Sequence, residues 1–169
     1  SRLWGVTRNP WNTEFTSGGS SGGSSASLAA GTSTICTGSD IGGSIRIPAS
    51  TCGLVGYKPP YGRNPEEAIF NLDFYCHTGP LARSVKDAIR LQNVMCGPSP
   101  RDIATLRPKL TLPYDYSPIK NWKIAYSRNL GCFEVDPEVE KNTLESLEIF
   151  KSLGATVEEV DLGWGPEVL

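Results

Sequence analysis

Serine and glycine residues concentrated between positions 17 and 59 are the part of this chain whose types and spacing could carry out chemistry. Residues 17–24 read SGGSSGGS, and residues 38–48 read GSDIGGSIRIP. A serine hydroxyl becomes a useful nucleophile when a neighbouring base takes its proton, and glycines leave consecutive backbone N–H groups accessible to a ligand. Because apolar residues such as Leu28 and Leu54 follow these segments directly, we expect them to lie inside a fold rather than in a flexible linker.

Two simpler sites could also use a glycine-rich segment. A phosphate-binding loop needs a Gly-Lys-Ser/Thr or Gly-x-Gly-x-x-Gly pattern at a strand–helix junction, and the segment has neither. A nucleophile elbow, Gly-x-Ser-x-Gly, matches residues 19–23 with Ser21 as the nucleophile. That site needs a base, and His77, the only histidine, follows no Asp/Glu-then-His pattern that would support a triad. An esterase that uses Ser21 is therefore kept as an alternative.

The whole segment resembles the signature sequence of the amidase signature family. The resemblance rests on GGSSGG at residues 18–23, GSDIGGSIRIP at 38–48, CGLVGYKP at 52–59 and GPLARSVKDA at 79–88. It implies a Ser–cis-Ser–Lys amidohydrolase of the α/β class, with a layered α/β/α fold around a mixed, largely parallel central sheet. It also implies a small-molecule amide substrate and a reaction without a metal or an organic cofactor.

The resemblance implies a role for each residue of the two serine motifs. Ser44 is expected to be the nucleophile, and Ser20 the bridging serine, held by a cis peptide bond on its N-terminal side. The backbone N–H groups of Ile41, Gly42 and Gly43 are expected to form the oxyanion hole, where each donor can contribute about 10²–10³ in rate. A relay from Ser44 through Ser20 to a neutral lysine needs no histidine.

Side chains beside the nucleophile are expected to brace its loop. We expect Asp40 and Arg46 to form a buried pair or hydrogen bonds that hold the N–H donors still, because mobile donors lose their preorganisation. A solvent-exposed, weak ion pair is the alternative. Ser21 is expected to brace the glycine-rich turn rather than to react.

The base of this relay is expected to lie outside the sequence. In the family that the chain resembles, the catalytic lysine precedes the glycine- and serine-rich motif. Lys58, the first lysine here, follows the nucleophile and is not its equivalent. We therefore expect residues 1–169 to be the central portion of a single amidase domain, without its N-terminal and C-terminal parts, and to be inactive in isolation.

Hydrophobic periodicity and capping residues predict alternating helices and strands around the motifs. Helices are predicted at residues 24–30, 44–52, 85–95 after the Ser84 cap and 137–153 after the Asp136 cap, and strands at 32–37, 54–57, 123–127 and 156–160. Residues 63–77 and 98–121 are predicted to be loops. The last strand, helix and strand form a βαβ unit, which requires parallel pairing and indicates the α/β class.

Length, charge and cysteine count limit the class of protein. A chain of 169 residues with a net charge of −2 can form one domain and has no basic stripe, so direct binding to nucleic acid is not expected. No apolar run approaches the roughly 18 residues of a membrane span, and a cytoplasmic location is expected. The five widely spaced cysteines argue against a disulfide framework and against structural zinc. The sequence carries no signal for an oligomeric state.

A free-standing amidase that releases ammonia or an amine is the favoured function. Relatives that supply ammonia for the transamidation of glutamyl-tRNA usually carry Ser-Leu-Asp-Gln before their Gly-Pro, where this chain has residues 74–77, FYCH. Such an amidotransferase subunit is one alternative. The others are the esterase and an inactive subunit that serves only for interaction.

Overall fold

The structure is a computed structural model that describes residues 2–67 and 69–168. The chain divides into two compact units, Ser1–Tyr114 and Asp115–Leu169, and each unit is described by itself. No helix of the described residues is long and apolar enough to cross a lipid bilayer.

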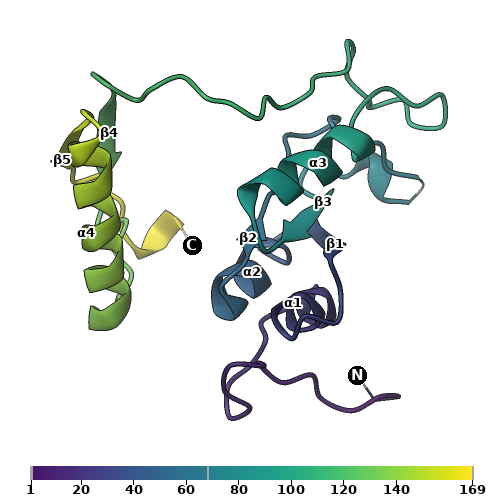
Figure 1. Ribbon diagram of the computed structural model, residues 1–169, viewed down its shortest axis with the longest axis horizontal. Coiled ribbons are helices and arrows are strands. Elements are labelled where there is room, and N and C mark those ends of the chain that lie inside the picture. The colour runs from purple at the N-terminus through teal and green to yellow at the C-terminus, as the bar shows by residue number, and fades with distance from the viewer. Residues whose placement is uncertain (1, 68, 169) are drawn as a thin grey trace. The chain divides into compact units, whose positions relative to one another are not determined.

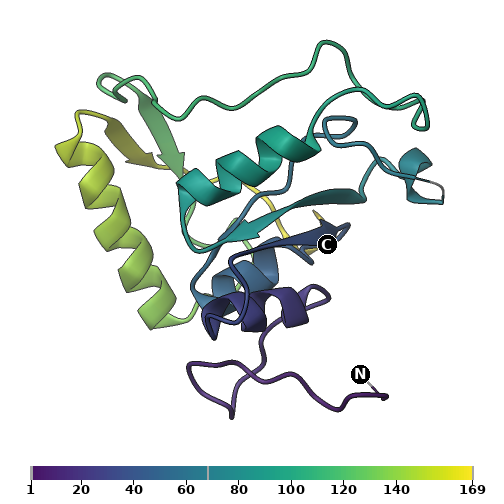
Figure 2. The ribbon, with the colours of Figure 1, turned by 45° about the vertical axis from the view of Figure 1, so that its right-hand side comes forward.

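The first unit is a three-stranded sheet covered by helices on both faces (Figures 1 and 2). Its elements are, in chain order, α1 (Gly22–Ala29), β1 (Ile35–Asp40), α2 (Arg46–Cys52), β2 (Val55–Gly56), the 3₁₀ turn η1 (Phe70–Leu72), β3 (His77–Ala82) and α3 (Val85–Met95). Both views show α3 on one face of the sheet and α1 with α2 on the other. The predicted α/β/α layering is therefore present within this unit.

The central strand of the sheet is β3, which pairs antiparallel with β1 and with β2. Asp40, the last residue of β1, lies opposite His77, the first residue of β3. This strand is a correction, because His77 was predicted to lie in a loop and no strand was predicted after it. The sequence of β3 includes Gly79 and Pro80, which are poor strand formers, so local propensity does not reveal it. Burial of its last four residues at the centre of the unit decides the conformation.

The other predicted elements of this unit are found, α3 with the predicted bounds and the rest with shifted ends. β1 begins at Ile35 and continues to Asp40 because its pairing with β3 extends that far. α1 begins at Gly22, at the glycine-rich turn itself, and α2 begins at Arg46, just after the serine motif. The predicted Ser84 cap is confirmed, since its hydroxyl accepts a hydrogen bond from the Asp87 N–H at 3.2 Å.

A small apolar core joins the two motif helices to the central strand. Its buried members are Leu28, Ile45, Ala49 and Leu81, with Cys36 and Leu54 packed against them. Ile45 follows Ser44 directly and is fully buried. The packing of Ile45 therefore anchors the backbone on the C-terminal side of the predicted nucleophile.

The second unit is the predicted βαβ arrangement. It contains β4 (Lys123–Tyr126), α4 (Pro137–Ser152), β5 (Thr156–Glu159) and the 3₁₀ turn η2 (Pro166–Val168). β4 and β5 pair in parallel, and the Asp136 carboxylate accepts from the Glu138 N–H at 2.8 Å, as its predicted cap role requires. The helices and the parallel pair confirm the predicted α/β class. The described strands, however, form one wholly antiparallel sheet and one separate parallel pair rather than a single mixed, largely parallel sheet.

Candidate active site

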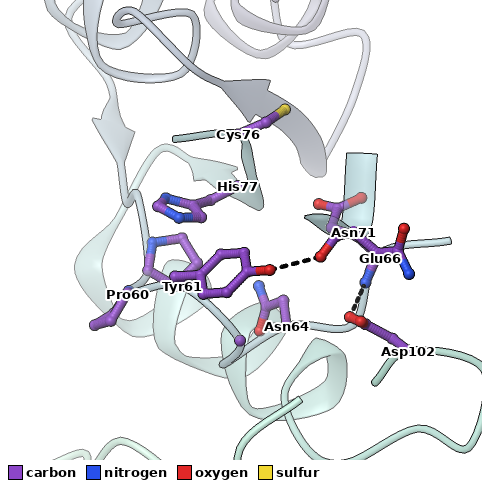
Figure 3. Close-up of a pocket in the computed structure, with 10 residues that line it drawn as sticks. Pro60, Tyr61, Asn64, Glu66, Asn71, Cys76, His77 and Asp102 are labelled. Atoms are coloured by element: carbon purple, nitrogen blue, oxygen red, sulfur yellow. Dashed lines mark hydrogen bonds between the residues drawn. The ribbon is translucent and has the colours of Figure 1, made fainter. Parts of the chain in front are cut away.

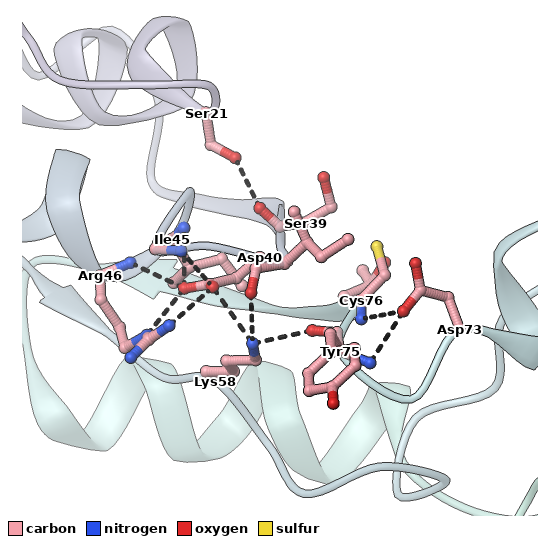
Figure 4. A network of polar contacts seen from close by, with 12 residues as sticks. Ser21, Ser39, Asp40, Ile45, Arg46, Lys58, Asp73, Tyr75 and Cys76 are labelled. Carbon is pink, nitrogen blue, oxygen red and sulfur yellow. Dashed lines mark hydrogen bonds and ion pairs between the residues drawn. The ribbon is translucent and has the colours of Figure 1, made fainter. Parts of the chain in front are cut away.

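The two predicted serine motifs meet in space. The backbone N–H of Ser21, the residue after Ser20, donates to the carbonyl oxygen of Ser44 at 3.2 Å. The Ser21 hydroxyl donates to the Ser39 carbonyl oxygen at 3.4 Å (Figure 4). Because this turn begins α1 and the loop after β1 carries Ser44, the packing of α1 on β1 and α2 holds the two motifs together.

Glycine is required where the first motif turns. The Gly19–Ser20 peptide bond is cis, as the family resemblance implied. Gly18 has φ +72°, and a Cβ built there would lie 2.8 Å from Thr51 Oγ1 and 2.9 Å from Pro48 Cα. A side chain at this position would push the turn away from α2.

The Asp40 carboxylate is the structural centre of the loop between β1 and α2, residues 41–45, which carries the predicted nucleophile Ser44 and is called the nucleophile loop below. Its side chain is fully buried at the end of β1. Oδ1 accepts from the Gly43 N–H at 2.7 Å, and Oδ2 accepts from the Ile45 N–H at 3.2 Å and the Arg46 N–H at 3.3 Å. The Arg46 guanidinium adds two bonds of 2.9 Å, from Nε to Oδ2 and from Nη2 to Oδ1 (Figure 4). The predicted contact between Asp40 and Arg46 is therefore present, with the carboxylate buried and the Arg46 side chain 55% exposed.

These contacts determine the charge of Asp40. Burial by itself would raise the pKa of the Asp40 carboxyl, but the hydrogen bonds from the Arg46 side chain and from the Gly43, Arg46 and Ile45 N–H groups outweigh it. The pKa of Asp40 is consequently held well below its usual range. The same bond raises the pKa of the Arg46 guanidinium. The loop is thus organised around a carboxylate that stays ionised at any ordinary pH.

The Asp40 contacts correct one predicted donor of the oxyanion hole. The Gly43 N–H points at the buried carboxylate in a short hydrogen bond, and an amide has a single hydrogen to donate. Gly43 therefore braces the loop. Ile41 and Gly42 stay predicted donors.

Lys58 also contacts Asp40, and this contact was not predicted from the sequence. Its Nζ lies 3.3 Å from Asp40 Oδ1 and donates to the carbonyl oxygen of Tyr75 at 2.8 Å (Figure 4). It also donates to the carbonyl oxygen of Ile41 at 3.2 Å. These partners belong to the nucleophile loop and to the segment before β3. The sequence signal for such a contact was only that Lys58 follows a short strand, and the pairing of β2 and β1 on either side of β3 was needed to bring it to Asp40.

His77 and Ser21 are not arranged as a nucleophile elbow requires. His77 lines a small pocket with Pro60, Tyr61 and Cys76 (Figure 3), and the centroids of the His77 and Tyr61 rings are 5.8 Å apart. Burial lowers the pKa of His77, and the positive charge of Lys58 acts in the same direction. The Ser21 hydroxyl is bonded to a backbone carbonyl, which fits the bracing role predicted for it.

The arrangement suits stabilisation of a developing anion. A Cβ built at Gly42 would meet no atom within 4 Å, so the α-carbon of Gly42 faces open space. Neighbouring peptides are held by the ion cluster of Asp40, Arg46 and Lys58, in which only the Asp40 side chain is fully buried. Among residues 2–67 and 69–168, no group of His, Cys, Asp and Glu side chains is arranged to hold a metal ion.

Comparisons with known proteins agree on one family. The family model described as Amidase matches residues 1–168. The acylamidase of Rhodococcus erythropolis is 38% identical over 166 residues, which cover 96% of this chain and 35% of that protein. A glutamyl-tRNA(Gln) amidotransferase subunit of Synechococcus sp. (strain CC9311) is 39% identical over 173 residues, which cover 93% of this chain and 33% of that protein.

Solved structures give the same result. A bacterial aryl acylamidase of the amidase signature family superposes with a TM-score of 0.84 at 40% identity, covering 94% of this chain and 33% of that one. The chain spans about a third of the length of the relatives it matches. The matched segment holds both serine motifs in one network, and the family match runs from the first residue to the last but one. The chain belongs to the amidase signature family.

Proposed function

We propose that the protein containing this chain hydrolyses the C–N bond of a carboxamide through an acyl-enzyme on Ser44. The observation that supports this is the joining of the two serine motifs by the Ser21–Ser44 backbone hydrogen bond, beside a loop braced by a buried carboxylate. Family membership supports the same chemistry, because relatives at about 40% identity are named as acylamidases.

In the proposed reaction, Ser44 Oγ attacks the carbonyl carbon while Ser20 accepts its proton and passes its own proton to a lysine base. The oxyanion that forms accepts hydrogen bonds from the Ile41 and Gly42 N–H groups. Collapse of the intermediate breaks the C–N bond, and the proton held by the relay goes to the leaving nitrogen. Water then attacks the acyl-enzyme by the same relay, releasing the acid and restoring Ser44.

A fluorophosphonate tests the nucleophile directly. We expect the whole protein to gain one adduct in its intact mass, and we expect the Ser44→Ala variant to gain none. Ser21→Ala is the matched control, because it removes a neighbouring hydroxyl that is bonded to the Ser39 carbonyl and does not react in the proposed mechanism, and it should still gain the adduct. An adduct that persists in Ser44→Ala and disappears in Ser21→Ala would refute the proposal.

An amidotransferase subunit is the second candidate. It is favoured by the relatives of that name, which are 39–42% identical to this chain. The free-standing amidase is favoured by residues 74–77, FYCH, which stand where amidotransferase subunits usually carry Ser-Leu-Asp-Gln before their Gly-Pro. Release of ammonia from simple carboxamides by the purified protein alone would support the amidase, whereas activity that needs a co-purifying partner and glutamine would support the amidotransferase.

A further inference from the structure

The ammonium group of Lys58 lies where three parts of the first unit meet. An ammonium has three N–H donors, and three acceptors surround Nζ: Asp40 Oδ1 at 3.3 Å, the Ile41 carbonyl at 3.2 Å and the Tyr75 carbonyl at 2.8 Å. The Lys58 side chain is 18% exposed. Its donors are therefore committed to the loop that precedes Ser44 and to the segment that precedes β3.

The bond to the Ile41 carbonyl has a consequence for Gly42. The Ile41 C=O and the Gly42 N–H belong to one planar trans peptide unit, in which the two groups point in opposite directions. A donor that holds the oxygen therefore sets the direction of the N–H. It also polarises the peptide, because hydrogen bonds in a chain strengthen one another.

The next peptide, between Gly42 and Gly43, has its N–H directed the opposite way, toward Asp40. The Gly43 N–H donates to Asp40 Oδ1, the same oxygen atom that lies 3.3 Å from Lys58 Nζ. The Gly43 N–H thus points toward the ion cluster, whereas the Gly42 N–H points away from it. A Cβ built at Gly42 meets no atom within 4 Å, so the α-carbon of Gly42 faces open space.

We propose that Lys58 is a positioning residue for the oxyanion hole. It holds the Ile41–Gly42 peptide so that the Gly42 N–H is directed at the reacting carbonyl oxygen, and this role rests on the proposed amide hydrolysis at Ser44. Lys58 touches neither reacting serine in the described network and acts only through the peptide that it binds. A lysine that merely neutralised Asp40 would affect folding but not the rate of the chemical step.

The test measures fluorophosphonate labelling of the whole protein at several inhibitor concentrations, so that the inactivation rate kinact and the binding constant KI are separated. Lys58→Met removes the donors, Lys58→Gln leaves a shorter, uncharged donor, and Lys58→Arg keeps both the donors and the charge. Lys86→Met is the matched control, since Lys86 is exposed on α3. Thermal unfolding of each variant reports whether it is folded.

We expect Lys58→Met and Lys58→Gln to lower kinact by about 10- to 100-fold, less than the loss of a whole oxyanion donor, with KI changed less than about twofold. Lys58→Arg should recover most of the rate, and Lys86→Met should match the wild type. A folded Lys58→Met or Lys58→Gln variant with the wild-type kinact would overturn the role of Lys58. So would variants that change only KI, or a Lys58→Arg variant that labels as slowly as Lys58→Met.

The wild-type result separates this inference from the proposed function. Absence of labelling at Ser44 in the wild type would refute the amidase mechanism itself. Wild-type labelling with unchanged Lys58 variants would refute only the positioning role.

Discussion

At the scale of single residues, Asp40 decides the shape of the nucleophile loop. It is fully buried and accepts hydrogen bonds from three backbone N–H groups and from the Arg46 side chain, with Lys58 also in contact. A buried carboxylate is tolerated when its lone pairs are satisfied by donors. Here the donors are the backbone of the loop itself, so the ion cluster and the loop conformation stabilise each other.

Replacing Asp40 by Asn should destabilise the protein. The change keeps the shape of the side chain but places an amide nitrogen against cations and N–H donors, which leaves Arg46 and Lys58 without their buried partner. We expect the free energy of unfolding to fall by about 3 kcal/mol, measured by urea denaturation of the whole protein. Asp115→Asn, at an exposed position, is the control and should change it by less than about 0.5 kcal/mol.

The difference in unfolding free energy between the wild type and Asp40→Asn depends on pH, and the pKa of Asp40 sets its sign. The pKa of Asp40 in the folded protein lies below the value of about 3.9 for an unfolded aspartate. The stabilisation is therefore complete above the unfolded pKa and is lost as pH falls toward the folded pKa. The stability difference between wild type and Asp40→Asn should be constant from about pH 8 to pH 5 and shrink below about pH 4. A difference that grew on acidification would contradict this assignment.

At the scale of elements, α1 is held in place by its buried residues. It packs against α2 and β1 with Ser25 and Leu28 fully buried. Two adjacent glycines at its start differ in their surroundings. A Cβ at Gly22 would lie 2.8 Å from the Oγ of the buried Ser17, whereas a Cβ at Gly23 would meet nothing within 4 Å.

These surroundings predict opposite effects for the same substitution. Gly23→Ala should raise the free energy of unfolding by about 0.5 kcal/mol, because alanine reduces the freedom of the unfolded chain and suits a helix. Gly22→Ala should lower it by about 1–3 kcal/mol through the clash with Ser17. Thermal unfolding of the two variants side by side measures both. Equal effects would show that the turn before α1 adapts to a side chain.

At the scale of the whole molecule, the chain contains the two serines of the proposed relay, whereas the lysine base is predicted to lie outside it. Lys58 contacts Asp40 and two carbonyl oxygens, so it is already committed as a hydrogen-bond donor. The chain spans about a third of the length of its relatives, in which the catalytic lysine is expected to precede the first motif. The reaction is therefore assigned to the whole protein.

Labelling of the isolated chain tests whether the base lies outside residues 1–169. We expect residues 1–169, expressed alone, to resist fluorophosphonate labelling under conditions where the whole protein labels at Ser44. Circular dichroism shows whether the isolated chain keeps its helices. Labelling of the isolated chain at Ser44 would mean that one of its own groups serves as the base.

Local patterns were sufficient for the features that depend on neighbouring residues. The Ser84 and Asp136 caps were predicted correctly because each follows from a few contiguous residues. The βαβ unit was predicted correctly because a strand, a helix and a strand in that order require parallel pairing. The strand β3 was missed because Gly79 and Pro80 disfavour a strand locally and only burial against both neighbours forms it.

The sequence by itself determined the family, because long motifs such as GSDIGGSIRIP record which backbone positions must be glycine, serine or a charge. It also placed Asp40 and Arg46 in one bracing pair, since they lie six residues apart around a turn. Only the tertiary structure decided that Lys58 joins Asp40 and that the Gly43 N–H faces inward. Those contacts depend on strands that pair across the sheet and on the direction of a single peptide plane, and neither is encoded in the spacing of residues along the chain.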